Sequence, residues 1–290
     1  MKRLLLVAVL ALLGAVPTAH ATFAGANGRI AASSTISEGE DFLTESLVTL
    51  APDGRGRGRD ARFLRECVKV NGEPEAGSDC DAEYRAPAWA PGGKRLVFDA
   101  GDSLALLNAD KSGFRVLPRS SADDGDPAFS PSGRQIVFHG RAARAQAVFV
   151  RGVDGGKARR LASGAATPDW SSRNRIAYVR TGVIYSVGPD GDRRRRVVRG
   201  REPSWSPSGR SLAFVRSDGI YAARADGKRV RRLVRCSDCR TPVFSPDGKL
   251  LVIDLKGLRT VRVSDGRLVR RVIDDSGMSI DFSEPSWQAR

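Results

Sequence analysis

The sequence predicts an all-β protein, a six-bladed β-propeller closed by a composite blade that both chain ends build. Three observations support this fold class. A phrase built on a Pro-x-aromatic triplet recurs along the chain, an Asp-Gly turn follows most copies, and the two ends carry complementary parts of one further copy. Self-similarity with a period of about 40 residues is typical of propeller blades.

The repeated phrase is easiest to follow at its aromatic residue. Copies such as Pro203-Ser-Trp-Ser-Pro-Ser-Gly209 recur at intervals of 35 to 43 residues. All four tryptophans of the 290-residue chain occupy this position, and phenylalanine fills it in the other two copies. The six aromatic residues are Trp89, Phe129, Trp170, Trp205, Phe244 and Trp287.

Each copy divides into four strands, as the copy that begins at Pro203 shows. Its triplet predicts a short inner strand whose aromatic side chain fills the space between blades. Pro-Ser-Gly is turn chemistry, since Pro presets φ and Gly accepts a positive φ. Leu212–Phe214 then predicts a buried second strand, and Ile220-Tyr221 a third. Asp226-Gly227 marks a tight hairpin before an outer strand at Arg231–Val234.

The chain ends predict how the ring closes. The last copy stops after Pro285-Ser-Trp287, and Gly28–Ser33 matches the second-strand phrase of the other copies. One blade therefore comes from both ends, and closure removes exposed sheet edges. Residues 22–290 are predicted to form this single domain. The five internal blades begin at Pro87, Pro127, Pro168, Pro203 and Pro242.

Residues 1–21 are predicted to be a secretory signal peptide. Met1-Lys2-Arg3 is a basic start, Leu4–Val16 is apolar, and Ala19-His20-Ala21 offers a cleavage point before Thr22. The apolar run is shorter than the roughly 20 residues of a membrane-spanning helix, and no later run is as long. We therefore expect a secreted or cell-envelope protein, periplasmic or extracellular, without stable membrane insertion.

The repeat resembles that of the TolB-like propellers, which are built from WD40-like (PD40) repeats. The resemblance rests on the phrase above with its Ile-Tyr strand and Asp-Gly turn, and Phe23–Ala31 is similar to the start of secreted members in high-GC bacteria. It implies the propeller fold and an envelope or extracellular location. TolB has a further α/β domain for which there is no room here. Copy three departs from the pattern, because Ser171–Asn174 lacks Pro and Gly, and its first hairpin is expected to be tighter or irregular.

The four cysteines form two local sets, each just before an inner strand. An even count in an exported protein predicts disulfides, here Cys67–Cys80 and Cys236–Cys239. Zinc is the alternative for Cys236-Ser-Asp-Cys239, but a structural zinc site needs four ligands and no second pair or His lies nearby in the sequence.

Motifs of catalysis are sparse. His139 is the single histidine outside the signal peptide, and no Gly-x-Ser-x-Gly elbow is present. We expect His139 to be a packing or solvent-facing residue, and we expect no enzymatic activity and no cofactor. Asp123, Asp124 and Asp126 precede Pro127 and are a weak candidate for Ca²⁺. A solvated turn is the preferred interpretation, since their spacing does not match an EF-hand loop.

Positive charge recurs at one phase of the repeat. The formal net charge is +15, and it remains +13 once Lys2 and Arg3 leave with the signal peptide. A belt of arginines at or near the start of the outer strands is therefore predicted around the rim. Its members are Arg159, Arg160, Arg193, Arg194, Arg195, Arg196, Arg231, Arg232, Arg270 and Arg271.

Such a belt favours an anionic envelope polymer or an acidic envelope protein as partner, because clustered charge raises the encounter rate with opposite charge. The same positive charge would attract nucleic acid, but the predicted export argues against nucleic acid as the partner. An equally strong explanation of the repeated arginines is that the whole sequence is rich in arginine and that charge protects the outermost strands from edge-to-edge pairing. The sequence thus favours a monomeric binding or scaffolding module. An envelope hydrolase or lyase acting on carbohydrate or peptide is the alternative.

Overall fold

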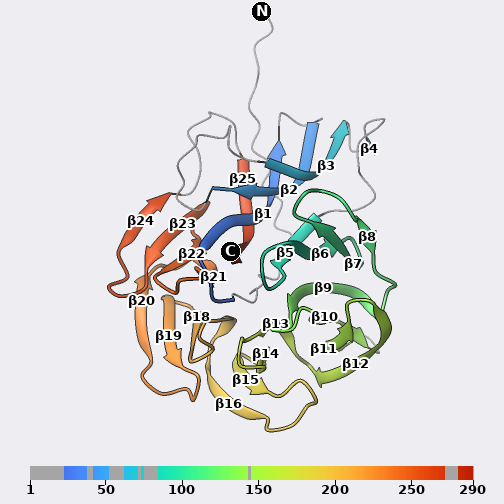
Figure 1. Cartoon of the computed structure of the whole chain (residues 1–290). Helices are drawn as coiled ribbons and strands as arrows, with labels where there is room; N and C mark the ends of the chain where they lie inside the picture. The colour runs from blue at the N-terminus through green and yellow to red at the C-terminus, as the bar shows by residue number, and fades with distance from the viewer. Residues whose placement is uncertain are drawn as a thin grey trace, which may run out of the picture.

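A computed structural model describes residues 23–37, 42–51, 62–70, 73–74, 84–142, 145–271 and 280–289. These residues form six antiparallel sheets and no helix. The sheets surround a common centre as the blades of a propeller (Figure 1). The predicted fold class and blade number are confirmed.

Blade 1 is the composite blade, and blades 2 to 6 follow in chain order. From the centre outward, blade 1 has β25 (Ile280–Ala289), β1 (Asn27–Ser37), β2 (Phe42–Leu50), β3 (Arg62–Val70) and β4 (Glu73–Pro74). Blade 2 has β5 (Tyr84–Trp89), β6 (Arg95–Ala100), β7 (Ser103–Asn108) and β8 (Arg115–Val116). Blade 3 has β9 (Ala122–Phe129), β10 (Gln135–Ala142), β11 (Ala145–Gly152) and β12 (Gly155–Ser163).

The remaining three blades repeat this order. Blade 4 has β13 (Ala166–Trp170), β14 (Ile176–Arg180), β15 (Val183–Val187) and β16 (Arg195–Arg199). Blade 5 has β17 (Arg201–Trp205), β18 (Ser211–Arg216), β19 (Gly219–Arg224) and β20 (Arg231–Arg235). Blade 6 has β21 (Arg240–Phe244), β22 (Leu250–Asp254), β23 (Leu258–Arg262) and β24 (Leu268–Arg271).

The two chain ends join in blade 1 as the sequence predicts. β25 pairs antiparallel with β1, and Trp287 lies opposite Ile30. The indole Nε1 of Trp287 donates a hydrogen bond to the carbonyl oxygen of Gly28 at 3.1 Å. The aromatic residues of the repeat are buried between blades, with Trp170, Trp205 and Trp287 at most 1% exposed. Burial of these large side chains is a main source of stability for the ring.

Each inner strand has a β-bulge just before its proline, which the sequence did not predict. The register of inner and second strands shifts there in blades 2 to 6. A positive φ at a residue other than glycine is unfavourable by about 1–2 kcal/mol, and its recurrence makes it a feature of the fold. The residues concerned are Ala86 (51°), Asp126 (51°), Thr167 (47°), Glu202 (52°) and Thr241 (45°).

The first hairpin of blade 4 is shorter than its equivalents, as expected from its missing Pro and Gly. The N–H of Ser171 donates to the carbonyl of Arg175, whereas in blade 3 the N–H of Ser130 donates to Gln135, one residue further along. Asn174 takes the left-handed conformation at φ 56° in place of glycine. Its Oδ1 also accepts a hydrogen bond from Nε1 of Trp170 at 3.0 Å.

A disulfide joins Cys236 to Cys239 in the connection between β20 and β21, with 5.8 Å between the Cα atoms. The spacing of these cysteines predicted this bond. The Cys67–Cys80 pair cannot be placed in the same way, because Cys80 and the side chain of Cys67 lie outside the described residues.

Candidate anion-binding site

Six arginines line a cavity of about 650 Å³ at the seam between blades 4 and 5. We call it the arginine pocket. Asp226 is the one carboxylate among the residues that line it. The wall is completed by Trp205, Gly209, Ser211 and Ala225. The arginines are Arg173, Arg175, Arg195, Arg210, Arg224 and Arg229.

The positive charge of the arginine pocket is only partly neutralised. The Nε of Arg224 lies 3.9 Å from Oδ2 of Asp226. The side chains of Arg210 and Arg229 have no hydrogen-bond or ion-pair partner within the described parts of the chain. Burial, together with the charge of Arg195, lowers the pKa of the Arg175 guanidinium. The pocket therefore presents a concentrated positive field to solvent.

Turns of two blades bring these arginines together. Arg173 and Arg175 lie on the short hairpin of blade 4, and Nε of Arg173 donates to the carbonyl of Ser208 in blade 5 at 2.9 Å. Gly209 permits this contact, because a Cβ there would lie 2.8 Å from Cγ of Arg173. Arg175 is held by Ser186 Oγ at 3.1 Å and by the carbonyl of Arg193 at 2.7 Å.

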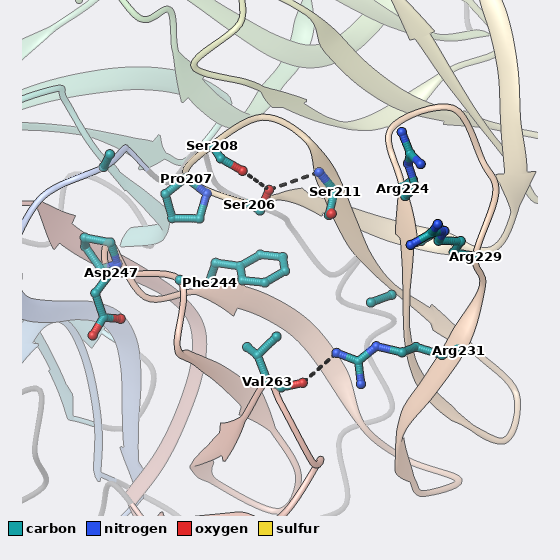
Figure 2. A pocket seen from close by; sticks show the side chains of 15 residues that line it. Ser206, Pro207, Ser208, Ser211, Arg224, Arg229, Arg231, Phe244, Asp247 and Val263 are labelled. Atoms are coloured by element: carbon teal, nitrogen blue, oxygen red, sulfur yellow. Dashed lines mark hydrogen bonds between the residues drawn. The ribbon is translucent and has the colours of Figure 1, made fainter.

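A second groove, of about 670 Å³, follows at the seam between blades 5 and 6. We call it the amphipathic groove. Its apolar lining includes Phe244 and Val263, and Arg231 and Asp247 stand at its edges (Figure 2). Arg224, Arg229 and Ser211 line both this groove and the arginine pocket. The two depressions are therefore neighbours on either side of blade 5.

The predicted belt contains two kinds of arginine. In blades 3, 4 and 5, one belt arginine crosses a seam and donates to a backbone carbonyl just before the Asp-Gly turn of the next blade. Arg195 donates to Ala225 at 3.2 Å and Arg231 to Val263 at 2.7 Å. Arg159 donates in the same way to the carbonyl of Pro189. These side chains hold neighbouring blades together and are called clamp arginines below.

Arg115 is a clamp arginine that the sequence analysis missed. It occupies the same register position in blade 2 and donates to the carbonyl of Val153 at 3.1 Å. It escaped notice because its neighbour is Val116, so that no Arg-Arg pair marks it. Register with the third strand is the signal that identifies it, since Arg115 lies opposite Leu106 as Arg231 lies opposite Ala222.

The other belt arginines whose side chains the structure describes are exposed; Arg193 and Arg194 precede β16, and the rest lie on outer strands. Arg160 and Arg196 are exposed and have no partner among the residues that the structure describes. Arg232 forms an ion pair with Asp218 at 2.8 Å. Arg193 lies 3.3 Å from Asp192, and Arg194 donates to the carbonyl of Leu161 at 3.3 Å. Arg270 is exposed, and the side chain of Arg271 lies outside the described part of the chain.

The acidic triplet before Pro127 is not a solvated turn, and that interpretation was wrong. Asp124 and Asp126 belong to β9 and are 2% and 5% exposed. Asp124 accepts hydrogen bonds from the N–H of Ser120 and the hydroxyl of Ser121, while burial raises its pKa. Asp123 alone is half-exposed and pairs with Arg141 at 2.8 Å. Within the described ranges, no three His, Cys, Asp or Glu side chains are grouped as metal ligands.

His139 lies beside this triplet. Its Nδ1 is 3.7 Å from Oδ2 of Asp126, and its side chain is 13% exposed. Burial lowers the pKa of His139, which favours the neutral imidazole.

Two buried carboxylates that the sequence did not mark link neighbouring blades at the inner strands. Oδ2 of Asp169 accepts the N–H of Trp205 at 2.6 Å, and Oε2 of Glu202 accepts the N–H of Thr241 at 2.7 Å. Burial raises the pKa of each carboxyl to about 7. Both therefore titrate near neutral pH.

No family model and no curated protein matches this sequence. Solved structures do match it. TolB from Acinetobacter baumannii has a TM-score of 0.69 at 17% identity, covering 91% of this chain and 67% of that one. A putative TolB from Agrobacterium tumefaciens has a TM-score of 0.63 at 17% identity, covering 91% and 100%. The chain has the TolB-like propeller fold.

Other propellers share this architecture. A puromycin-hydrolyzing peptidase from Mycobacterium tuberculosis matches with a TM-score of 0.54 at 16% identity, over 87% of this chain and 56% of the peptidase. At such identities these proteins share the fold with this TolB-like propeller, and function has to be argued from its own residues. In the part of the chain that the structure describes, no helix has the length and apolar character to cross a membrane.

Proposed function

We propose that this TolB-like propeller is an exported, non-catalytic binding or scaffolding module that recognises an anionic partner through the arginine pocket. The observation that carries the proposal is that Arg210 and Arg229, beside four further arginines, are exposed and have no side-chain partner among the described residues. Mutual repulsion makes such a cluster costly unless an anion neutralises it. Guanidinium groups bind carboxylates and phosphates in a bidentate manner, so an acidic protein or an anionic envelope polymer would satisfy them.

An envelope or extracellular location fits three features. Residues 1–21 have the layout of a secretory signal, and the Cys236–Cys239 disulfide suits an oxidising compartment. The third feature is the similarity to TolB structures.

The proposal is tested by comparing two double variants that remove equal charge. Arg210→Ala with Arg229→Ala empties the arginine pocket of its unpartnered groups, whereas Arg160→Ala with Arg196→Ala removes exposed charge from the belt. Fluorescence anisotropy would measure binding of labelled inorganic polyphosphate and poly-glutamate. We expect the pocket variant to bind at least about tenfold more weakly and the belt variant to bind nearly as the parent does.

Salt gives a second readout. Binding should weaken steeply as ionic strength rises, because the screening length is about 8–10 Å at physiological salt. Equal losses in both double variants would show that the whole belt, and not the arginine pocket, attracts the anion. No binding by the parent protein would overturn the proposal.

An envelope hydrolase or lyase is the second candidate. The buried pair of His139 and Asp126 favours it, since a neutral imidazole beside a carboxylate can act as a general base. Assays with chromogenic peptides and glycosides would test it. Turnover that Asp126→Asn and His139→Gln both abolish would establish catalysis, and the absence of turnover agrees with a binding module.

A further inference from the structure

The amphipathic groove differs chemically from the arginine pocket beside it. Phe244, Val263 and Ala222 supply an apolar floor. Arg224 and Arg229 form the edge that the two depressions share. We propose that the two together bind one extended acidic peptide segment of a partner protein, with an apolar side chain in the groove and neighbouring carboxylates in the arginine pocket. This inference rests on the proposed function and names its ligand class.

The apolar floor selects against a simple polyanion. Ala222 is small and packs on the side of blade 5 that faces blade 6, so the floor leaves room between these blades for an aliphatic or aromatic side chain. Covering apolar surface is favourable at about 25 cal/mol per Å². A phosphate polymer has no apolar group to place there, whereas a peptide carries acidic and apolar side chains along one backbone.

Charge at the edges of the groove points the same way. On the blade 5 side, the Arg231 guanidinium is fixed by the carbonyl of Val263 at 2.7 Å (Figure 2). On the blade 6 side stands Asp247, whose pKa is lowered by hydrogen bonds from the Ser245 hydroxyl and the Lys249 N–H against the effect of partial burial. A uniform polyanion would meet this ionised carboxylate and be repelled. A peptide can turn its acidic residues toward the arginines and away from Asp247.

An extended peptide can present an apolar and an acidic side chain on the same side. Side chains at alternate positions of an extended peptide point to the same side and lie about 6.6 Å apart. With a leucine in the amphipathic groove, a glutamate two residues away would point to the same side, toward the arginines that line both depressions. Arg224 and Arg229 stand where the apolar and acidic parts of such a ligand would meet.

The test uses three probes on the full exported protein. Two labelled peptides of about ten residues carry glutamate at alternate positions and polar residues between them. They differ only at one central glutamate position, which holds leucine in one peptide and serine in the other. The third probe is labelled inorganic polyphosphate. We expect the leucine peptide to bind about tenfold more tightly than the serine peptide, as burial of one aliphatic side chain implies.

Substitutions in the groove assign this preference to it. Val263→Ser should reduce the advantage of leucine while polyphosphate binding stays within about twofold, because serine makes the floor polar and adds no charge. Val263→Thr is a milder variant that should also reduce the advantage if Val263→Ser fails to fold. Arg210→Ala with Arg229→Ala should weaken all three probes.

Each other outcome has a defined meaning. Equal binding of the two peptides by the parent would overturn the acidic-peptide inference and leave the anion-binding function standing. If polyphosphate binds more tightly than either peptide, and substitution of Val263 does not change its affinity, the site recognises a polymer and the inference is also overturned. Failure of all three probes would overturn the proposed function itself.

Discussion

Asp169 is the residue at which pH should act most directly on this protein. Burial raises the pKa of its carboxyl from 3.8 to about 7, so the folded state holds the proton more tightly than the unfolded chain does. The folded state therefore loses stability as the pH rises from about 4 to about 7, and the loss persists above that range.

Asp169→Asn tests this effect. The amide keeps an oxygen for the Trp205 N–H and carries no charge. We expect the free energy of unfolding in urea to rise by about 1–4 kcal/mol near pH 8, and to change little near pH 4. Asp154→Asn, which removes a carboxylate from an exposed turn, is the control and should change the free energy of unfolding by less than about 0.5 kcal/mol. A variant that is less stable than the parent near pH 8 would contradict the expected sign.

Single residues were the hardest part to predict from the sequence. Asp and Glu in turn-rich connections are normally solvated, which is why Asp124 and Asp126 were expected in a solvated turn and Glu202 was not marked at all. The bulge before each proline has no sequence signature, because the five positions from Ala86 to Thr241 hold four residue types that differ in size and charge. Polar side chains just before an inner strand are normally expected in solvent, but the bulge places them in the interior.

At the scale of strands and turns, the sequence predicted much more. The Pro-x-aromatic triplets, the turns and the third strands lie where expected, because local turn chemistry and alternation specify them. The clamps across the seams were not predictable in this way. Their acceptors are backbone carbonyls 30 to 38 residues further along the chain, and a carbonyl has no sequence signature.

The clamp predicts different effects for two adjacent arginines of one outer strand. Arg195 donates across the seam to the carbonyl of Ala225, whereas Arg196 is exposed without a partner in the described residues. We expect Arg195→Ala to lower the free energy of unfolding by about 1–2 kcal/mol, since a charge-assisted hydrogen bond is lost. Arg196→Ala should change it by less than about 0.5 kcal/mol. Equal effects in thermal or urea unfolding would mean that the clamp does not stabilise the seam.

For the whole molecule, ring closure is the property on which stability depends most. The last strand, β25, forms hydrogen bonds on both sides of the seam between blades 1 and 2. Trp287 donates to Gly28 within blade 1, while Ser286 Oγ accepts the N–H of Trp89 at 3.2 Å and Gln288 Nε2 donates to the carbonyl of Gly93 at 2.7 Å. The sequence predicted this closure because both fragments of the composite blade match the repeat.

Deletion of residues 285–290 should therefore destabilise all six blades together. It removes the buried Trp287, leaves residues 27–31 of β1 without a partner strand and breaks both hydrogen bonds to blade 2. We expect the melting temperature to fall by about 10 °C or more, or the cooperative transition to disappear. Trp287→Phe is the matched control, since it keeps an aromatic ring and loses one hydrogen bond, and it should lower the melting temperature by only about 2–4 °C. A truncated protein that melts within about two degrees of the parent would show that the ring does not depend on this strand, and that each blade is stabilised mainly by its own sheet and one neighbour.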